Sequence, residues 1–172
     1  MVNFLHMGLK GLRRVIELVI ILLFIYMTIA VIVQVIGRYV FNFSIASAVE
    51  TATFAQIWMV LLAAGTAMRW GLHVSVDILV TQLPSKVVRI INVPITFLCL
   101  WFLWVVFDGS FRLLEIGDIQ SSPVLRIPMF YPYLAIPVAA VYLALEFVIV
   151  MWTKTFGDPG AVTKEQEEQG AL

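Results

Sequence analysis

The chain has 172 residues, of which 62% are hydrophobic and only 13% are charged, and its formal net charge is zero. So little polar surface cannot cover a water-soluble globule of this size, which excludes a soluble domain. A net charge of zero also excludes the basic footprint of a nucleic-acid-binding protein, so no nucleic-acid partner is expected.

Four stretches are nearly free of charge and long enough to cross a membrane. About 20 apolar residues in a helix span the hydrocarbon core of a bilayer. An open sheet would leave its edge amides unpaired in lipid, and no series of alternating strands is present to close a barrel. The sequence therefore predicts an all-α integral membrane protein with four transmembrane helices, at about residues 15–40, 48–70, 85–112 and 129–153.

Polar segments flank these four helices. Residues 1–14 form a basic lead, and residues 154–172 form a polar tail that is expected to be disordered; both are expected to be cytoplasmic. A secretory signal cleaved near Ala46-Ser47-Ala48 is an alternative for the first apolar run. This alternative is disfavoured because the run is longer than the apolar region of a signal peptide.

Lys and Arg are distributed unequally over the two sides that four alternating spans create. Eight of the eleven fall on the side of the termini, and three fall on the other side, at Arg38, Arg112 and Arg126. By the positive-inside rule both termini are cytoplasmic. This predicts a multi-pass membrane protein with both termini on the cytoplasmic side.

The polar crossing between the first two helices holds Asn42, whose side chain can turn the backbone. Ser47 and Glu50 then have the spacing of a capping box, which predicts that Ser47 caps the second helix with Glu50 as its partner. Contact of Glu50 with a partner protein is the alternative.

Small residues are frequent in the second helix. Ala63 and Ala67 have the small-xxx-small spacing that permits close helix packing, and Gln56 could donate an interhelical hydrogen bond. We therefore expect this helix to be the packed centre of the protein.

Arg69, His73 and Asp77 recur every four residues after the second helix, with apolar residues on another face. This pattern predicts an amphipathic helix at about residues 71–83 that lies in the inner membrane interface. An ion pair or hydrogen bond between His73 and Asp77 would orient this interfacial helix. A proton relay is the less favoured alternative because no third titratable group is in line.

Prolines and one acid mark the last two helices. Pro94 is expected to bend the third helix, Pro128 to begin the fourth, and Pro137 to kink its first turns. Glu146 is the one carboxylate well inside a predicted span. A buried charge is costly unless it is paired or protonated, so Glu146 is either a hydrogen-bonded packing residue or a functional site.

Cys99, the single cysteine, is expected to be a small buried hydrophobe.

Several function classes can be compared with these features. A small multidrug-exporter-like homo-oligomer would use a membrane carboxylate such as Glu146, but its flanking charge would be balanced. A haem anchor would need two facing histidines inside the bundle, whereas His6 and His73 lie at its cytoplasmic edge. A carrier that works alone would show paired repeats with broken helices, and no internal repeat is found in this sequence.

Because no nucleophile, metal or phosphate motif is present, we expect no enzyme activity, catalytic residue, metal or cofactor. The remaining class is a supporting subunit of another membrane protein.

Two stretches carry a family resemblance, QVIGRYVFNFSIASAVETATFAQIWMVLLAAGTAMRWGLHVSVDIL from residue 34 and LRIPMFYPYLAIPVAAVYLAL from residue 125. They resemble the small membrane subunit of tripartite ATP-independent periplasmic (TRAP) transporters, the DctQ-like family. The matching residues are Arg38, Tyr39, Asn42, Glu50, Arg69, Gly71, His73, Asp77, Pro128, Tyr133 and Pro137. The chain departs from the family pattern at Ser47, Val49 and Thr53, where Trp, a second acid and Arg are frequent.

The resemblance implies a role in sodium-coupled uptake, a symport, of an organic acid across the bacterial or archaeal cell inner membrane. The chain would be a static scaffold, and its partners would be a large membrane transport subunit, a periplasmic substrate-binding protein and membrane lipids. Sodium would bind the large subunit and not this chain. The candidate subunit-interface or structural residues are Arg38, Asn42, Glu50, Gln56, Arg69, His73, Asp77, Pro128, Tyr133 and Glu146.

Overall fold

A computed structural model of the chain describes residues 2–43, 45–69 and 85–156, with side chains for residues 8–43, 45–69 and 93–152. Within these ranges the chain forms α1 (Val2–Tyr39), α2 (Ala46–Arg69), α4 (Ser85–Ile119), α5 (Phe130–Tyr133) and α6 (Ala135–Phe156). Four of the described segments are long and apolar enough to cross a membrane: most of α1, α2, most of α4, and α5 with α6. The expected all-helical fold with four long apolar helices is therefore confirmed.

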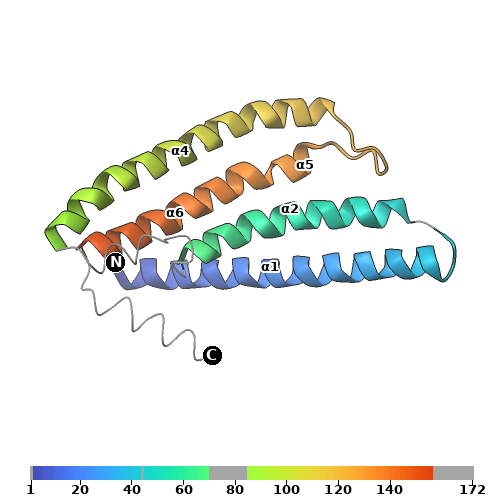
Figure 1. Ribbon diagram of the computed structural model, residues 1–172, viewed down its shortest axis with the longest axis horizontal. Coiled ribbons are helices and arrows are strands. Elements are labelled where there is room, and N and C mark those ends of the chain that lie inside the picture. Colours follow the sequence, from blue (N-terminus) through green and yellow to red (C-terminus); the bar gives the residue numbers. More distant parts are fainter. Residues whose placement is uncertain (1, 44, 70–84, 157–172) are drawn as a thin grey trace.

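The long helices lie side by side in the order α1, α2, α6, α4, as Figure 1 shows. α2 packs against α1 on one side and α6 on the other, and α4 packs against α6 and α5. The described helices thus form an open row, with α1 and α4 as its two edges. We call the end where α1 begins and α6 finishes the terminal end, and the end that holds residues 40–45 and 120–129 the loop end.

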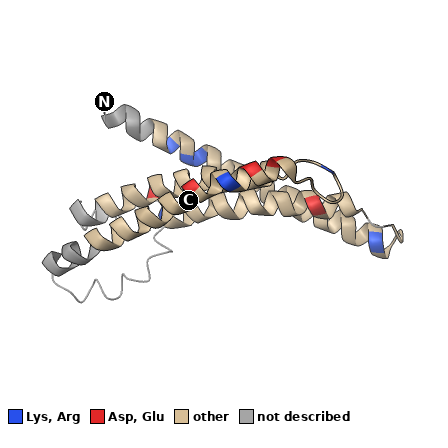
Figure 2. Cartoon of the chain, turned by 90° about the horizontal axis from the view of Figure 1, so that it is seen from above, with Lys and Arg blue, Asp and Glu red and all other residues tan. Residues whose placement is uncertain are grey.

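The first helix is longer than the sequence indicated. We expected a separate lead over residues 1–14, but α1 begins at Val2 and continues to Tyr39 without interruption. No proline separates the lead from the apolar run, and the ion pairs described below attach this part of α1 to other helices. Figure 2 shows that α1 diverges from the rest of the row toward its N-terminus, where several of its Lys and Arg residues lie.

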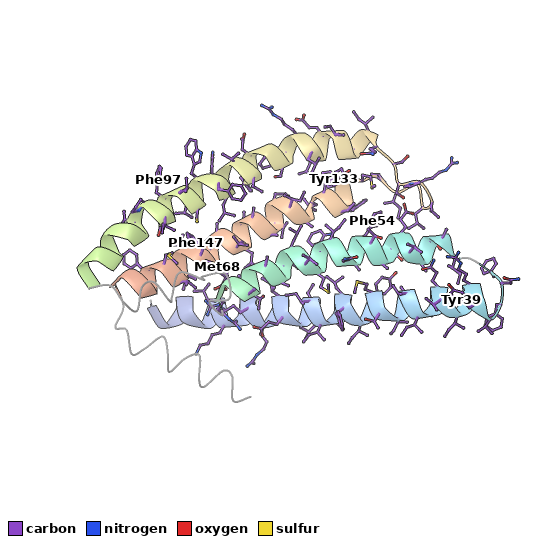
Figure 3. All side chains as sticks on the ribbon, viewed as in Figure 1. Tyr39, Phe54, Met68, Phe97, Tyr133 and Phe147 are labelled. Carbon is purple, nitrogen blue, oxygen red and sulfur yellow. The ribbon has the colours of Figure 1, made fainter. Side chains whose placement is uncertain are left out.

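The centre of the row is shared by two helices, whereas we expected the second helix alone to form it. In the apolar window of α6, 44% of residues are buried, against 28% in α2 and none in α1. Met68 of α2 and Phe147 of α6 belong to one apolar cluster with Met151, and Figure 3 shows the first two close together. The most buried helix is therefore the last one to be synthesised.

Close contact of α2 with α6 depends on Gly65 and not on the predicted Ala63 and Ala67, which are only half-buried. A Cβ atom at Gly65 would collide with the aromatic ring of Tyr142, itself 5% exposed. The buried positions of α2 are Ala52, Ala55, Leu62, Gly65 and Met68. Their spacing of three, seven, three and three residues selects a different face from that of Ala63 and Ala67.

Proline interrupts the last span, as expected. Helix α5 ends at Tyr133, and α6 begins at Ala135, two residues before Pro137. Pro137 has no N–H to donate to the carbonyl of Tyr133, so the helical hydrogen-bond pattern is interrupted one turn before Pro137. Pro94 lies inside α4, which curves along its length (Figure 1). At the other end of α4, Gly117 lies so close to Met129 and Phe130 that a side chain there would collide with the backbone.

Helix α4 also differs from its expected bounds, since it continues past residue 112 to Ile119. Residues 112–119 include Arg112, Glu115 and Asp118, all exposed, so this extension is more polar than the rest of the helix. The predicted interfacial helix at residues 71–83 lies outside the described residues, as does most of the predicted tail.

We expect Gly65→Ala to destabilise the protein by about 1–3 kcal/mol, because the added methyl group overpacks the contact with Tyr142. Gly109→Ala is the matched control. It adds the same methyl group in another helix where no atom lies within 4 Å, and should be neutral or stabilising by up to about 1 kcal/mol. Denaturant unfolding of the detergent-purified protein measures both. Equal stability of the two variants would contradict the proposed close contact.

Candidate functional site

A buried ion pair joins the first and last helices at the terminal end. The guanidinium of Arg13 donates two hydrogen bonds to the carboxylate of Glu146, from Nε to Oε1 at 2.8 Å and from Nη2 to Oε2 at 2.7 Å. Glu146 is 0% exposed and the Arg13 side chain is 19% exposed. A bidentate pair of this kind offsets the cost of placing a carboxylate between apolar helices. Glu146 is therefore a paired residue in helix packing.

A second ion pair lies one turn further along α1 and joins it to α2. Arg69, the last residue of α2, donates from Nη2 to Oε1 of Glu17 at 2.6 Å. The last described residue of α2 is thus level with Glu17. Arg13 lies one turn before Glu17 in α1 and pairs with Glu146 of α6.

Sequence reasoning missed both Arg13 and Glu17. Four residues separate them in one helix, a spacing that favours an ion pair within the helix. In the structure each side chain binds a different helix instead: Arg13 binds α6 and Glu17 binds α2. One signal in the sequence could have pointed to them. Glu146 needs a cation and Arg69 needs an anion at the same depth in the membrane, and Arg13 and Glu17 supply these charges.

The loop end is held by Glu50, though not by the predicted capping box. Ser47 already lies inside α2, which begins at Ala46. The carboxylate of Glu50 instead accepts a hydrogen bond from the backbone N–H of Leu125 at 2.7 Å and a longer one from Val124 at 3.5 Å. Glu50 therefore attaches a distant loop to the start of α2. In place of the capping box, the carboxylate binds these two loop amides.

That loop, residues 120–129, is a short hairpin. Its two sides are joined by backbone hydrogen bonds from Ser122 N–H to Ile127 C=O at 2.9 Å and from Met129 N–H to Gln120 C=O at 2.8 Å. Tyr133 donates from its hydroxyl to the side chain of Gln120 at 3.3 Å. Together with the Glu50 contacts, these bonds hold the 120–129 hairpin against α2 and the start of α5.

An open groove lies where α1, α2 and the hairpin meet. It is lined by Gln34, Ala46, Val49, Glu50, Pro123 and Val124. Most of its surface is apolar and it is shallow, so it does not enclose a small polar solute. Within the described residues no group of three or more His, Cys, Asp or Glu side chains is placed to hold a metal ion.

The other candidate residues are distributed over the surface. Arg38 is exposed and lies 6.0 Å from the ring centre of Tyr39, and Asn42 has a left-handed backbone with φ of 54°. Gln56 is exposed, and among the described residues its side chain makes no interhelical hydrogen bond, which the sequence had left possible. Pro128 is exposed in the hairpin. His73 and Asp77 lie outside the described residues.

The sequence profile of the DctQ component of tripartite ATP-independent periplasmic transporters matches residues 27–157, about three quarters of the chain. The chain belongs to the DctQ family. The DctQ match includes Glu50, Arg69, the 120–129 hairpin and Glu146, but it begins after Arg13 and Glu17. Both ion pairs of the terminal end thus connect a residue inside the matched region with a residue before it.

Two relatives agree with this assignment. The chain is 27% identical over 150 residues to the C4-dicarboxylate TRAP transporter small permease protein DctQ of Vibrio cholerae, in an alignment that covers 73% of this chain and 65% of that protein. It is 26% identical over 133 residues to a putative TRAP transporter small permease protein of Haemophilus influenzae, covering 77% of this chain and 83% of that protein. The chain thus spans slightly less than two thirds of the Vibrio relative.

Arg13→Ala should destabilise this DctQ-family protein by about 3–5 kcal/mol, because it leaves the carboxylate of Glu146 buried without a counter-ion. Arg14→Ala is the matched control, since it removes the same charge from the next, exposed residue and should change stability by less than about 0.5 kcal/mol. The double variant Arg13→Met with Glu146→Met should recover most of the loss, because no charge then remains buried. Denaturant unfolding in detergent distinguishes these outcomes, and equal effects of the two single variants would contradict the role of the pair.

Proposed function

We propose that the chain is the small, static membrane subunit of a TRAP transporter that takes up an organic acid together with sodium. A periplasmic binding protein would deliver the acid to a large membrane subunit, which would bind the acid and sodium and move them across the membrane. The Vibrio relative is named for C4-dicarboxylates. We therefore propose C4-dicarboxylates as the first substrates to test.

The observation that carries this proposal is the open row of helices. Its two edges, α1 and α4, bury almost none of their apolar windows inside the chain, at 0% and 6%. Phe97 points outward from α4 in Figure 3 and is 70% exposed. A row of this kind offers long apolar faces to another membrane protein but encloses no path for a solute among the described helices. Both properties suit a scaffold against which a larger subunit is mounted.

The state of Glu146 argues against the alternative, a small homo-oligomeric exporter. A carboxylate that couples transport to protons must exchange protons and contact the solute. Glu146 is 0% exposed and holds both oxygens against Arg13. This geometry favours a structural ion pair over a coupling site.

Reconstitution tests the proposed function. Proteoliposomes that contain this chain alone should take up no radiolabelled succinate under an inward sodium gradient. Proteoliposomes that also contain the large subunit, with the binding protein added outside, should take it up. Uptake by the chain alone would contradict the proposal, as would full uptake by the large subunit and binding protein without the chain.

We also propose that the loop end is periplasmic and that both termini are cytoplasmic. The bias of Lys and Arg toward the terminal end supports this orientation. In a Cys99→Ala background, Ile119→Cys, at a loop-end position that is 90% exposed, should react with a membrane-impermeant maleimide in intact spheroplasts. Lys10→Cys, which is exposed at the terminal end, should react only after permeabilisation. Labelling of Lys10→Cys in intact spheroplasts would contradict the orientation.

A further inference from the structure

Arg126 has an unusual backbone conformation at the tip of the 120–129 hairpin. Its φ of 54° lies in the left-handed region, where a side chain with a Cβ crowds the backbone. Glycine occupies this region without penalty, and Asn or Asp tolerates it, which is why these residues dominate such turns. An arginine at this position is therefore unfavourable for the hairpin itself.

Side-chain contacts among the described residues do not compensate for this conformation. Arg126 is exposed, and among the described residues none accepts a hydrogen bond from its guanidinium or forms an ion pair with it. The side chain therefore contributes no charge pairing to the described fold. Residues held in sparsely populated backbone conformations cluster at functional sites such as ligand clamps.

The surrounding hydrogen bonds hold the backbone of Arg126 from both sides. The two preceding residues, Val124 and Leu125, donate their N–H groups to Glu50 of α2. The following residue, Ile127, accepts a hydrogen bond from Ser122. The cation is thus presented from a rigid tip whose position relative to α2 is fixed, which lowers the conformational entropy lost when a partner binds it.

We propose that Arg126 is a docking residue for the soluble periplasmic subunit, with its guanidinium binding a carboxylate on the surface of that protein. This inference rests on the proposed function and on the proposed orientation, which places the hairpin on the periplasmic side. Glu50 is a positioning residue for the same contact, because it holds the backbone of the tip. The contact provides long-range attraction and a fixed register between the two proteins.

The test titrates the binding protein against the complete transporter in proteoliposomes and measures the binding-protein concentration that gives half-maximal succinate uptake. Arg126→Glu should raise this concentration about tenfold at low ionic strength while the maximal rate stays near that of the unchanged transporter. The difference should shrink at high salt, since exposed charges are screened. Arg112→Glu is the matched control, because it makes the same charge reversal at an exposed loop-end position in a regular helix, and should change the concentration less than about twofold.

Arg126→Gly separates docking from folding. Glycine relieves the strain at φ of 54°, so this variant should unfold at the same or a higher temperature than the unchanged protein. It should nevertheless require more binding protein for half-maximal uptake, because the cation is gone. Glu50→Gln should also raise the half-maximal concentration, and hydrogen exchange at Val124 and Leu125 should become faster.

An unchanged half-maximal concentration for Arg126→Glu would overturn the docking inference while leaving the proposed function intact. A defect that follows the content of anionic lipid in the vesicles and not the binding-protein concentration would also overturn it, by assigning Arg126 to lipid phosphate. If the unchanged transporter shows no uptake that depends on the binding protein, the proposed function fails, and the docking inference fails with it.

Discussion

A carboxylate between apolar helices needs a cation close to it, and this requirement determines how the terminal end of the protein is built. Glu146 is completely buried in α6, the most buried helix of the row, and Arg13 of α1 supplies both of its hydrogen bonds. Arg69, the last described residue of α2, pairs with Glu17, which lies one turn after Arg13 in α1. The buried charge of Glu146 thus attaches the first turns of α1 to α6, beside a second ion pair that attaches α1 to α2.

The loop end is held by a different kind of interaction. There a carboxylate, Glu50, binds backbone N–H groups of the 120–129 hairpin, and no cation takes part. Helices α1, α2 and α6 are therefore joined by side-chain ion pairs at one end, while α2 and the hairpin are joined through the backbone at the other. Between these ends, packing such as that of Gly65 against Tyr142 supplies the contact. The edges α1 and α4 remain open along their length, which is the basis of the scaffold role that we propose.

Much of the fold could be predicted from the sequence because it follows from the solvent. Long uncharged runs require helices in lipid, and Pro137 breaks the last one close to where its missing N–H predicts. The groups to which individual charged side chains bind were less predictable. Ser47 and Glu50 have the spacing of a capping box, yet Glu50 binds amides 74 and 75 residues away, and a one-dimensional pattern does not contain such distant contacts. Likewise, Arg13 and Glu17 have the spacing of a local pair, but each finds a more demanding partner on another helix.

The chain order of the terminal pair has a consequence for biosynthesis. Arg13 leaves the ribosome long before Glu146, so the cation is already in place at the membrane surface when the last helix enters. A deletion at the amino end that includes Arg13 would take the counter-ion away from a completely buried acid, whereas loss of the last helix would remove the acid together with its need for a counter-ion. Truncation of this protein should therefore keep the part of the first helix that contains Arg13.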